Sequence, residues 1–159
     1  MTASTDLSPI TRSVNVACDL ATAFELFTSG MGSWWPFEVH SIAVDRETGQ
    51  RAVDVAFEPF VGGEVAEIAD DGSRAHWATV LAFEPPHRLV LAWQPNPDRT
   101  SHTELELRFS AIAEGTLVEL EHRGWEGLGA GAEQARAGYA STAGWVTTLR
   151  HFAAAVSQA

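Results

Sequence analysis

The chain has 159 residues, of which 45% are hydrophobic, and carries a formal net charge of −11. Phosphate backbones and anionic lipid surfaces repel a chain this acidic, so we expect neither a nucleic acid nor a membrane as its partner. Its apolar runs fall short of the roughly 18 residues that a membrane span needs. The polar start Met1–Asp6 predicts no signal peptide, and the one cysteine, Cys18, cannot build a disulfide framework, so these features favour a cytoplasmic location.

The N-terminal part of the chain predicts one strand and one short helix. We expect a flexible tail over residues 1–9 and then a single domain over residues 10–159, because the chain has the length of one domain and shows no linker or internal repeat. Apolar and polar residues alternate over Ile10–Ala17, as in a strand. A helix follows over Leu20–Phe27, with Asp19 in the position of an N-cap. A second short helix is expected near the aromatic segment that comes next.

Strands separated by turns fill the middle of the chain. An Asp-Gly pair at residues 71–72 is a strong hairpin signal. Two of the predicted strands, over residues 51–57 and 74–83, each turn three apolar residues toward one face. These residues are Val53, Val55 and Phe57 in the first strand, and Trp77, Leu81 and Phe83 in the second.

The last third of the chain predicts a strand followed by a long helix. Val118, Leu120 and His122 alternate on one face of the strand Thr116–His122, and a glycine-rich break follows. Within the helix, apolar residues recur at spacings of four, three and four, which is typical of a buried face. They are Trp145, Leu149, Phe152 and Val156. Strands with one polar face prefer antiparallel pairing, and this terminal helix would cover their apolar face.

Short motifs follow one another along the chain: Trp34-Trp35-Pro36, Gly62-Gly63, Asp71-Gly72, Glu84-Pro85, Leu91-Ala92-Trp93, Thr116, His122, Gly124-Trp125 and Gly144-Trp145. Their order and spacing resemble the START-like, or SRPBCC, superfamily. Within it, the chain is most similar to the group that resembles the C-terminal domain of the activator of heat-shock protein 90 ATPase. The resemblance runs from Ile10 to Val156.

The resemblance implies an α+β helix-grip fold. In this fold a curved antiparallel sheet surrounds a long C-terminal helix, two short helices follow the first strand, and an apolar cavity lies between sheet and helix. Members of the superfamily bind hydrophobic small molecules, and some act as cyclases or hydrolases. The chain departs from the group at Ala75-His76-Trp77, where many members carry glycine. A tryptophan there should narrow any cavity that this strand lines.

We expect the cavity beneath the N-terminal half of the C-terminal helix. Continued backward from Trp145, the inner stripe of the helix reads Thr142, Gly138 and Ala135, which are small residues that leave space. Mostly aromatic residues would line the rest of the site, as in other apolar pockets. The predicted ligand-binding residues are Trp34, Trp35, Phe57, Trp77, Trp93, Phe109, His122, Trp125, Gly138, Tyr139, Thr142 and Trp145.

The sequence predicts neither a metal site nor a nucleotide cofactor. Its histidines form no H-x-H or H-E-x-x-H pair, and no second cysteine is present. Gly127–Ala132 matches a dinucleotide fingerprint, but no second parallel strand follows the helix, as a nucleotide-binding unit would require.

These observations favour a cytoplasmic protein that binds a small hydrophobic or aromatic molecule between its sheet and its C-terminal helix. Two alternatives stay open at this point. One is a cyclase or hydrolase that uses His122, although a structural histidine with satisfied hydrogen bonds is the favoured interpretation of that residue. The other is a chaperone-linked protein-interaction module. The assembly is also open, a homodimer included.

Overall fold

The computed structural model describes residues 7–37, 49, 51–94 and 102–158. A single antiparallel sheet of seven strands has the order β1-β7-β6-β5-β4-β3-β2. Its strands are β1 (Ile10–Val16), β2 (Ala52–Phe57), β3 (Glu64–Ala69), β4 (Arg74–Glu84), β5 (Arg88–Trp93), β6 (Thr103–Ile112) and β7 (Gly115–Arg123). Apart from β1, each strand pairs with its neighbour in sequence, and β1 closes onto the last strand, with Ile10 opposite His122. This α+β helix-grip architecture confirms the predicted fold class.

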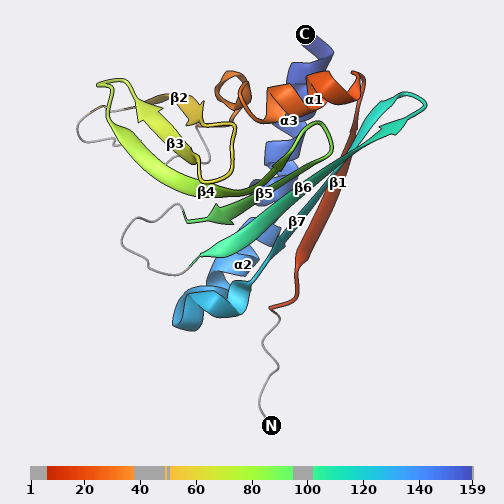
Figure 1. Ribbon diagram of the computed structural model, residues 1–159. Helices are drawn as coiled ribbons and strands as arrows, with labels where there is room; N and C mark the ends of the chain where they lie inside the picture. Colours follow the sequence, from red (N-terminus) through yellow and green to blue (C-terminus); the bar gives the residue numbers. More distant parts are fainter. Residues whose placement is uncertain (1–6, 38–48, 50, 95–101, 159) are drawn as a thin grey trace.

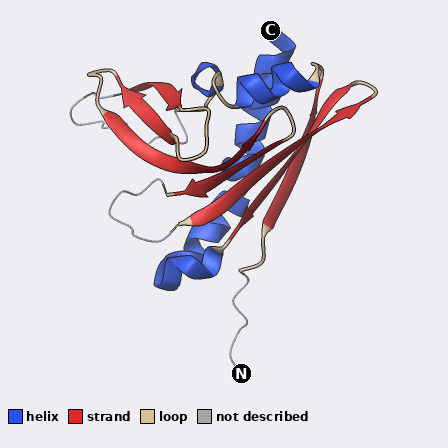
Figure 2. Cartoon of the chain, viewed as in Figure 1, coloured by secondary structure: helices blue, strands red, loops and turns tan. Residues whose placement is uncertain are grey.

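The helices gather on the concave side of the sheet, as Figures 1 and 2 show. They are α1 (Leu20–Phe27), a single 3₁₀ turn η1 (Met31–Ser33), the 3₁₀ segment η2 (Trp125–Gly131), α2 (Ala132–Ala140), the π segment η3 (Thr142–Val146) and α3 (Thr147–Gln158). Helix α1 begins as predicted, because the Asp19 carboxylate accepts a hydrogen bond from the backbone N–H of Thr22 at 3.0 Å. None of the helices in the described part of the chain has the length and apolar character that a membrane span requires.

The C-terminal helical segment is present, but it is bent where the sequence predicts continuity. Helix α2 ends at Ser141, whose backbone is extended, and Gly144 has non-helical angles of φ −87° and ψ −129°. A Cβ atom at position 144 would collide with the carbonyl oxygen of Tyr139, so this bend requires glycine. Beyond the bend, the predicted inner stripe is confirmed, with Trp145, Leu149, Phe152 and Val156 all buried.

Two β-bulges change the predicted faces of the middle strands. The register shifts between Ala52 and Asp54 in β2, and between Val80 and Ala82 in β4. The extra residue of a bulge leaves the strict alternation. Val53 and Leu81 are therefore 56% and 42% exposed, instead of pointing inward as predicted.

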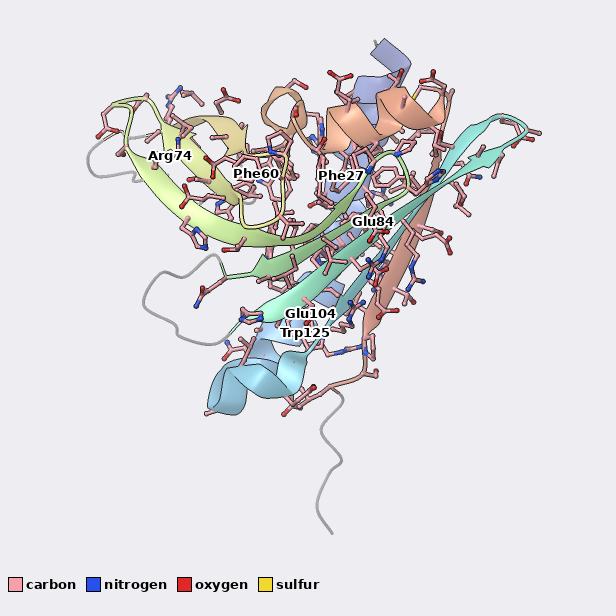
Figure 3. The ribbon with its side chains drawn as sticks, in the orientation of Figure 1. Phe27, Phe60, Arg74, Glu84, Glu104 and Trp125 are labelled. Atoms are coloured by element: carbon pink, nitrogen blue, oxygen red, sulfur yellow. The ribbon has the colours of Figure 1, made fainter. Side chains whose placement is uncertain are left out.

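The outer face of the sheet carries a network of charged residues around Glu106. Its two carboxylate oxygens accept hydrogen bonds from Arg88 (2.8 Å), Arg108 (2.8 Å) and Arg123 (2.7 Å). Glu84 and Glu104 complete the network through ion pairs with Arg88 and Arg123. Figure 3 labels both glutamates on the sheet. Glu106 is not solvated on this face, because the arginines leave only 4% of its side chain exposed. These hydrogen bonds lower the pKa of Glu106 to about 2 against the opposing effect of its burial.

Candidate functional site

Tryptophan side chains from distant parts of the chain meet on the concave side of the sheet. Trp35 follows η1, Trp77 lies in β4, Trp93 ends β5 and Trp145 lies in η3. Their ring centroids are 4.6 Å apart for Trp35 and Trp77, 5.9 Å for Trp77 and Trp93, and 5.4 Å for Trp93 and Trp145. We call these four residues the tryptophan cluster. None of them is more than 7% exposed, so the cluster fills the middle of the space between sheet and helix.

A β-bulge aims Trp77 at this cluster. Val65 of β3 lies opposite Ala78, whereas the next residue, Ala66, lies opposite His76, so Trp77 is the extra residue in β4. Bulges commonly redirect a side chain in this way. The indole N–H of Trp77 has no hydrogen-bond acceptor among the residues that the structure describes, although the side chain is only 2% exposed. A buried indole N–H normally has a partner.

His122 joins one end of the cluster to the strand below it. As predicted, its side chain points inward with Val118 and Leu120, and it is fully buried. Its Nδ1 accepts a hydrogen bond from the indole N–H of Trp145 at 2.9 Å, which places the ring proton on Nε2. Nε2 lies 2.6 Å from the Thr103 hydroxyl and donates to it, and that hydroxyl in turn faces the Trp93 carbonyl at 3.4 Å.

The surroundings of His122 keep its ring neutral. Burial lowers the pKa of His122 to about 3, because the charged form would lose its hydration. With both ring nitrogens engaged inside the protein, the arrangement favours the structural interpretation of this histidine. A role as general base would first require the bond to Trp145 or to Thr103 to break.

Trp125 and Tyr139 close the end of the cluster next to α2. Trp125 is fully buried, stacks obliquely on His122 at 4.1 Å, and donates its indole N–H to the His122 carbonyl oxygen at 3.0 Å. Tyr139 is half-buried and lies parallel to Trp145, with centroids 5.7 Å apart. Its hydroxyl oxygen accepts a hydrogen bond from the indole N–H of Trp93 at 2.9 Å. Figure 3 shows Trp125 at this end of the sheet.

Other predicted site residues lie elsewhere. Trp34 contacts Trp35 but donates its N–H to the Leu26 carbonyl oxygen, and its ring packs between Phe27 and Phe152. Phe109 contacts Phe24 and Phe27 beneath α1, and the half-buried Phe57 contacts Phe83. These phenylalanines belong to the same hydrophobic core but do not contact the rings of the tryptophan cluster in any ring pair between described residues. Gly138 and Thr142 are exposed, and a Cβ at position 138 would meet open space, so neither residue is brought to the cluster.

Glu67 is a buried acid that the sequence analysis did not single out. It lies opposite Val55 in β2 and Ala75 in β4. The two-residue period that places Val65 on the concave face places Glu67 there as well. Glu67 is fully buried and interacts with other residues. The signal in the sequence is its position between Val65 and Ala69 on one strand face.

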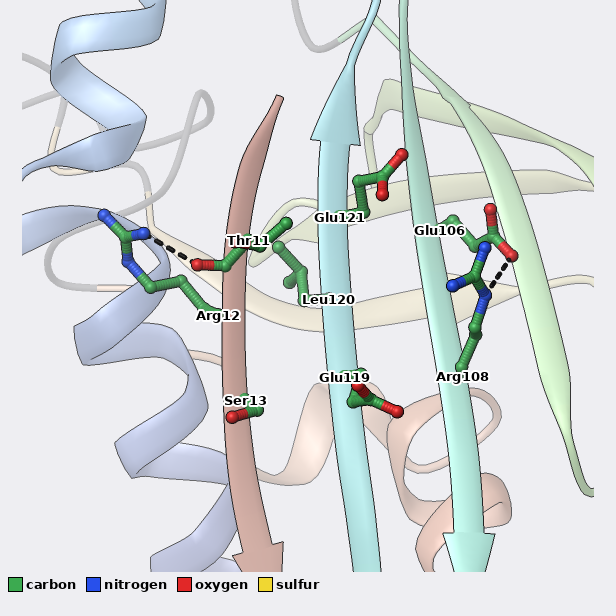
Figure 4. A pocket seen from close by; sticks show the side chains of 8 residues that line it. All are labelled: Thr11, Arg12, Ser13, Glu106, Arg108, Glu119, Leu120 and Glu121. Atoms are coloured by element: carbon green, nitrogen blue, oxygen red, sulfur yellow. Dashed lines mark hydrogen bonds and ion pairs between the residues drawn. The ribbon is translucent and has the colours of Figure 1, made fainter. Parts of the chain in front are cut away.

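Two pockets lined by described residues lie away from the tryptophan cluster. One is a shallow polar hollow of about 260 Å³ over β1, β7 and β6, which Figure 4 shows. It is lined by Thr11, Arg12, Ser13, Glu106, Arg108, Glu119, Leu120 and Glu121. The other, of about 400 Å³, lies between α1 and the turn after β4, and Phe24, Phe83, Pro85 and Pro86 are among its lining residues. Within the described residues, no group of three or more histidine, cysteine or acidic side chains could hold a metal ion.

A curved antiparallel sheet that holds a C-terminal helix, with aromatic residues between them, defines the helix-grip class of proteins. The model of the family described as activator of Hsp90 ATPase homolog 1-like protein matches residues 18–157. The chain belongs to this family. No curated protein matches the chain.

Solved structures of the same fold cover nearly the whole chain. The anthrahydroquino-γ-pyrone synthase Txn09 is 33% identical, with a TM-score of 0.62, over 95% of this chain and 98% of its own. A protein from Rhodobacter sphaeroides is 19% identical, with a TM-score of 0.67, over 97% of this chain and 95% of its own. The Aha1 dimer from Colwellia psychrerythraea is 14% identical, with a TM-score of 0.63, over 94% of this chain and 96% of its own. The last two likenesses show the fold alone.

Proposed function

We propose that this chain is a cytoplasmic binding protein for a planar aromatic molecule that carries oxygen substituents, held at the tryptophan cluster. The observation that carries the proposal is the indole N–H of Trp77, which is buried beside Trp35 and Trp93 without an acceptor among the described residues. A hydroxyl or carbonyl oxygen on a flat ring would satisfy this donor, while the ring would contact the neighbouring indoles. The 33% identity to a synthase of an anthrahydroquino-γ-pyrone supports the same ligand class.

Calorimetric titration with 1,8-dihydroxyanthraquinone tests this proposal. We expect the wild-type chain to bind the probe. Trp77→Phe should weaken binding by about threefold to tenfold, which is the range for one hydrogen bond. Trp34→Phe is the matched control, since the Trp34 N–H is already satisfied by Leu26 and that variant should bind as the wild type does. No binding by the wild type, or equal losses in both variants, would contradict the proposal.

A second candidate function is ring closure on such a molecule. Two observations favour it: the identity to Txn09, and the buried carboxyl group of Glu67 on the concave face. In such a closure, a phenol oxygen adds to one carbonyl carbon of a 1,3-diketone side chain on the same molecule. The carbonyl oxygen then leaves as water, which carries the phenol proton and one proton from the carbon between the two carbonyls, and a C=C bond forms there. A carboxylate could accept the phenol proton and return it to the departing oxygen. Glu67→Gln should then abolish turnover of a phenol that bears a 1,3-diketone side chain. The same variant should keep the affinity for 1,8-dihydroxyanthraquinone within about twofold.

Exposed apolar residues favour a protein partner in addition to the small molecule. Phe60 and Val61, in the loop between β2 and β3, are 55% and 65% exposed. This loop is bonded to β4 through the N–H of Gly62 and the carbonyl of Val80 at 2.8 Å, next to the exposed Leu81. A homodimer is the partner we propose, as in the Aha1 dimer from Colwellia psychrerythraea. Light scattering should give twice the chain mass for the wild type and the chain mass for Val61→Asp. A monomeric wild type would refute this assembly.

A further inference from the structure

The stacking of Tyr139 on Trp145 differs from the other ring contacts of Trp145. The planes of these two rings are 20° apart, so they lie nearly parallel. Against Trp35, Trp93 and His122, the Trp145 ring lies edge-on at 76°, 62° and 65°. One face of the Trp145 ring is therefore a flat surface that a second flat ring covers, and in this structure the covering ring is a phenol.

The hydroxyl oxygen of Tyr139 also has a hydrogen-bond donor. Trp93 donates its indole N–H to the Tyr139 hydroxyl at 2.9 Å. A stacking surface from Trp145 and a buried donor from Trp93 are the two contacts that a hydroxylated or keto aromatic ligand needs. The ring and oxygen of Tyr139 thus have the contacts that a small phenol would make if it were bound at this place.

The helix that carries Tyr139 is weakly held. Among the nine residues of α2, Ala132 is the buried one. Glycines with non-helical angles lie just before and after the helix: Gly129 (φ 68°, ψ −131°) and Gly144 (φ −87°, ψ −129°). Two arginine contacts also hold it, from Arg12 to the Ala140 carbonyl oxygen at 3.0 Å and from Arg136 to the Ser8 carbonyl oxygen at 2.6 Å. Outward movement of α2 would therefore remove from the core only Ala132 among its fully buried residues, together with the partly buried Ala135, Tyr139 and Ala140, and would uncover the ring face of Trp145.

We infer that the Tyr139 side chain occupies the place of the ligand's oxygen-bearing ring, and that the ligand displaces it. This inference rests on the proposed function and narrows it. The ligand class is a planar aromatic molecule with a phenol or quinone oxygen, which stacks on Trp145 and accepts the hydrogen bond of the Trp93 indole. Trp77, 5.9 Å from Trp93 between ring centroids, offers a second donor for a ligand of two or more fused rings. Tyr139 then acts as a competitor of the ligand rather than as a wall of its site.

Fluorine NMR tests the displacement without any substitution. The chain contains one tyrosine, so uniform labelling with 3-fluorotyrosine yields a single signal, from position 139. On saturation with 1,8-dihydroxyanthraquinone, we expect this signal to move to the shift of the urea-unfolded chain, which is that of an exposed ring. If the probe binds but the signal keeps a chemical shift different from that of the unfolded chain, the inference is overturned and the proposed function still stands.

Affinities of matched variants give the second test. If the ligand binds only molecules whose Tyr139 side chain has moved out of the site, the apparent affinity equals the intrinsic affinity multiplied by the fraction of such molecules. Tyr139→Ala should therefore bind 1,8-dihydroxyanthraquinone about tenfold tighter than the wild type, or more. Tyr139→Ala should also bind p-cresol, the side-chain analogue of tyrosine, about threefold to tenfold tighter than toluene, because only p-cresol can accept the bond from Trp93. Tyr139→Phe keeps the ring in place and should bind neither small molecule.

The outcomes separate the inference from the proposed function. If the wild type binds the probe and Tyr139→Ala binds it equally or more weakly, Tyr139 lines the ligand site and does not compete with the ligand. This result would overturn the inference but not the proposed function. Absence of probe binding by both chains, with no p-cresol binding by Tyr139→Ala, overturns the inference and the proposed function together. Urea unfolding of each variant confirms that the compared chains are folded.

Discussion

The indole N–H of Trp145 donates to Nδ1 of His122 across 2.9 Å, and this one bond fixes the tautomer of a fully buried histidine. Trp145 comes from η3, next to the bend of the C-terminal segment, and His122 comes from β7. The bond therefore ties the helix to the sheet at the tryptophan cluster. It also makes the buried polar groups of this region dependent on one another.

Removal of one partner of this bond should be costly. Trp145→Phe leaves Nδ1 of His122 without its donor, and we expect a loss of about 1–3 kcal/mol beyond the lost ring area. Replacement of both partners, Trp145→Phe with His122→Phe, removes the unsatisfied group. In a double-mutant cycle from urea unfolding, the double variant should thus lose less than the sum of the two single variants. Additive losses would mean that the two residues are not coupled.

The low pKa of His122 predicts a pH dependence of stability. The pKa is about 3 in the folded chain, against 6.5 as the ordinary value. Between these values the unfolded chain holds a proton that the folded chain lacks, so the free energy of unfolding rises with pH. The contribution is complete above pH 6.5 and falls by about 1.4 kcal/mol for each pH unit below it. Relative to His122→Phe, the wild type should lose stability at this slope between pH 6 and pH 4.5. Parallel profiles would contradict a neutral buried ring.

The network around Glu106 predicts a second dependence, at lower pH. Glu106→Gln removes the charge that three arginines share, and should cost about 2–3 kcal/mol, at the low end for buried ion pairs because the arginines are partly exposed. The folded pKa of about 2 lies below the ordinary 4.5. The stabilisation is therefore present above pH 4.5 and is lost as the pH falls toward 2. Glu119→Gln, at an exposed position of the same face, is the control and should be nearly neutral.

The inner stripe of α3 supplies a third kind of test. Leu149 is 3% exposed, and Leu149→Ala should cost about 2–5 kcal/mol in urea unfolding. The exposed neighbour Arg150, replaced by alanine, should change stability by less than about 0.5 kcal/mol. A loss from Leu149→Ala as small as that of the control would mean that this helix face is not packed against the core.

Periodic features of the fold could be predicted from the sequence, and local irregularities could not. The alternation up to His122 and the stripe from Trp145 to Val156 report burial directly, because burial selects apolar residues at each period. The bulges at Val53 and Leu81 each add one residue to a strand, and the apolar–polar alternation of the sequence does not predict where this happens. The bend at Ser141–Gly144 depends on the Tyr139 carbonyl, a contact that exists only in the folded chain.

In the candidate site, too, the periodic features could be predicted from the sequence and the local irregularities could not. His122 is buried as predicted, because its position follows from the strand period. The expectation for Gly138 and Thr142 differs from the structure, because the stripe was extended backward from Trp145 through a bend that resets the helix phase. Glu67 was not singled out, because its position between Val65 and Ala69 is one interruption of an apolar alternation and not a repeated pattern. That the N–H of Trp77 has no acceptor among the described residues depends on the arrangement of its neighbours and is visible only in the structure.

Nuclear magnetic resonance of the indole N–H groups tests the central claim most directly. The six tryptophans give six ¹⁵N-labelled indole signals, which can be followed during titration with 1,8-dihydroxyanthraquinone. Binding at the tryptophan cluster should shift the signals of Trp77, Trp93 and Trp145 most, and that of Trp34 least, because its N–H is bonded to Leu26 outside the cluster. Indole signals that stay unchanged at saturating probe, or a largest shift at Trp34, would contradict a ligand site at the tryptophan cluster.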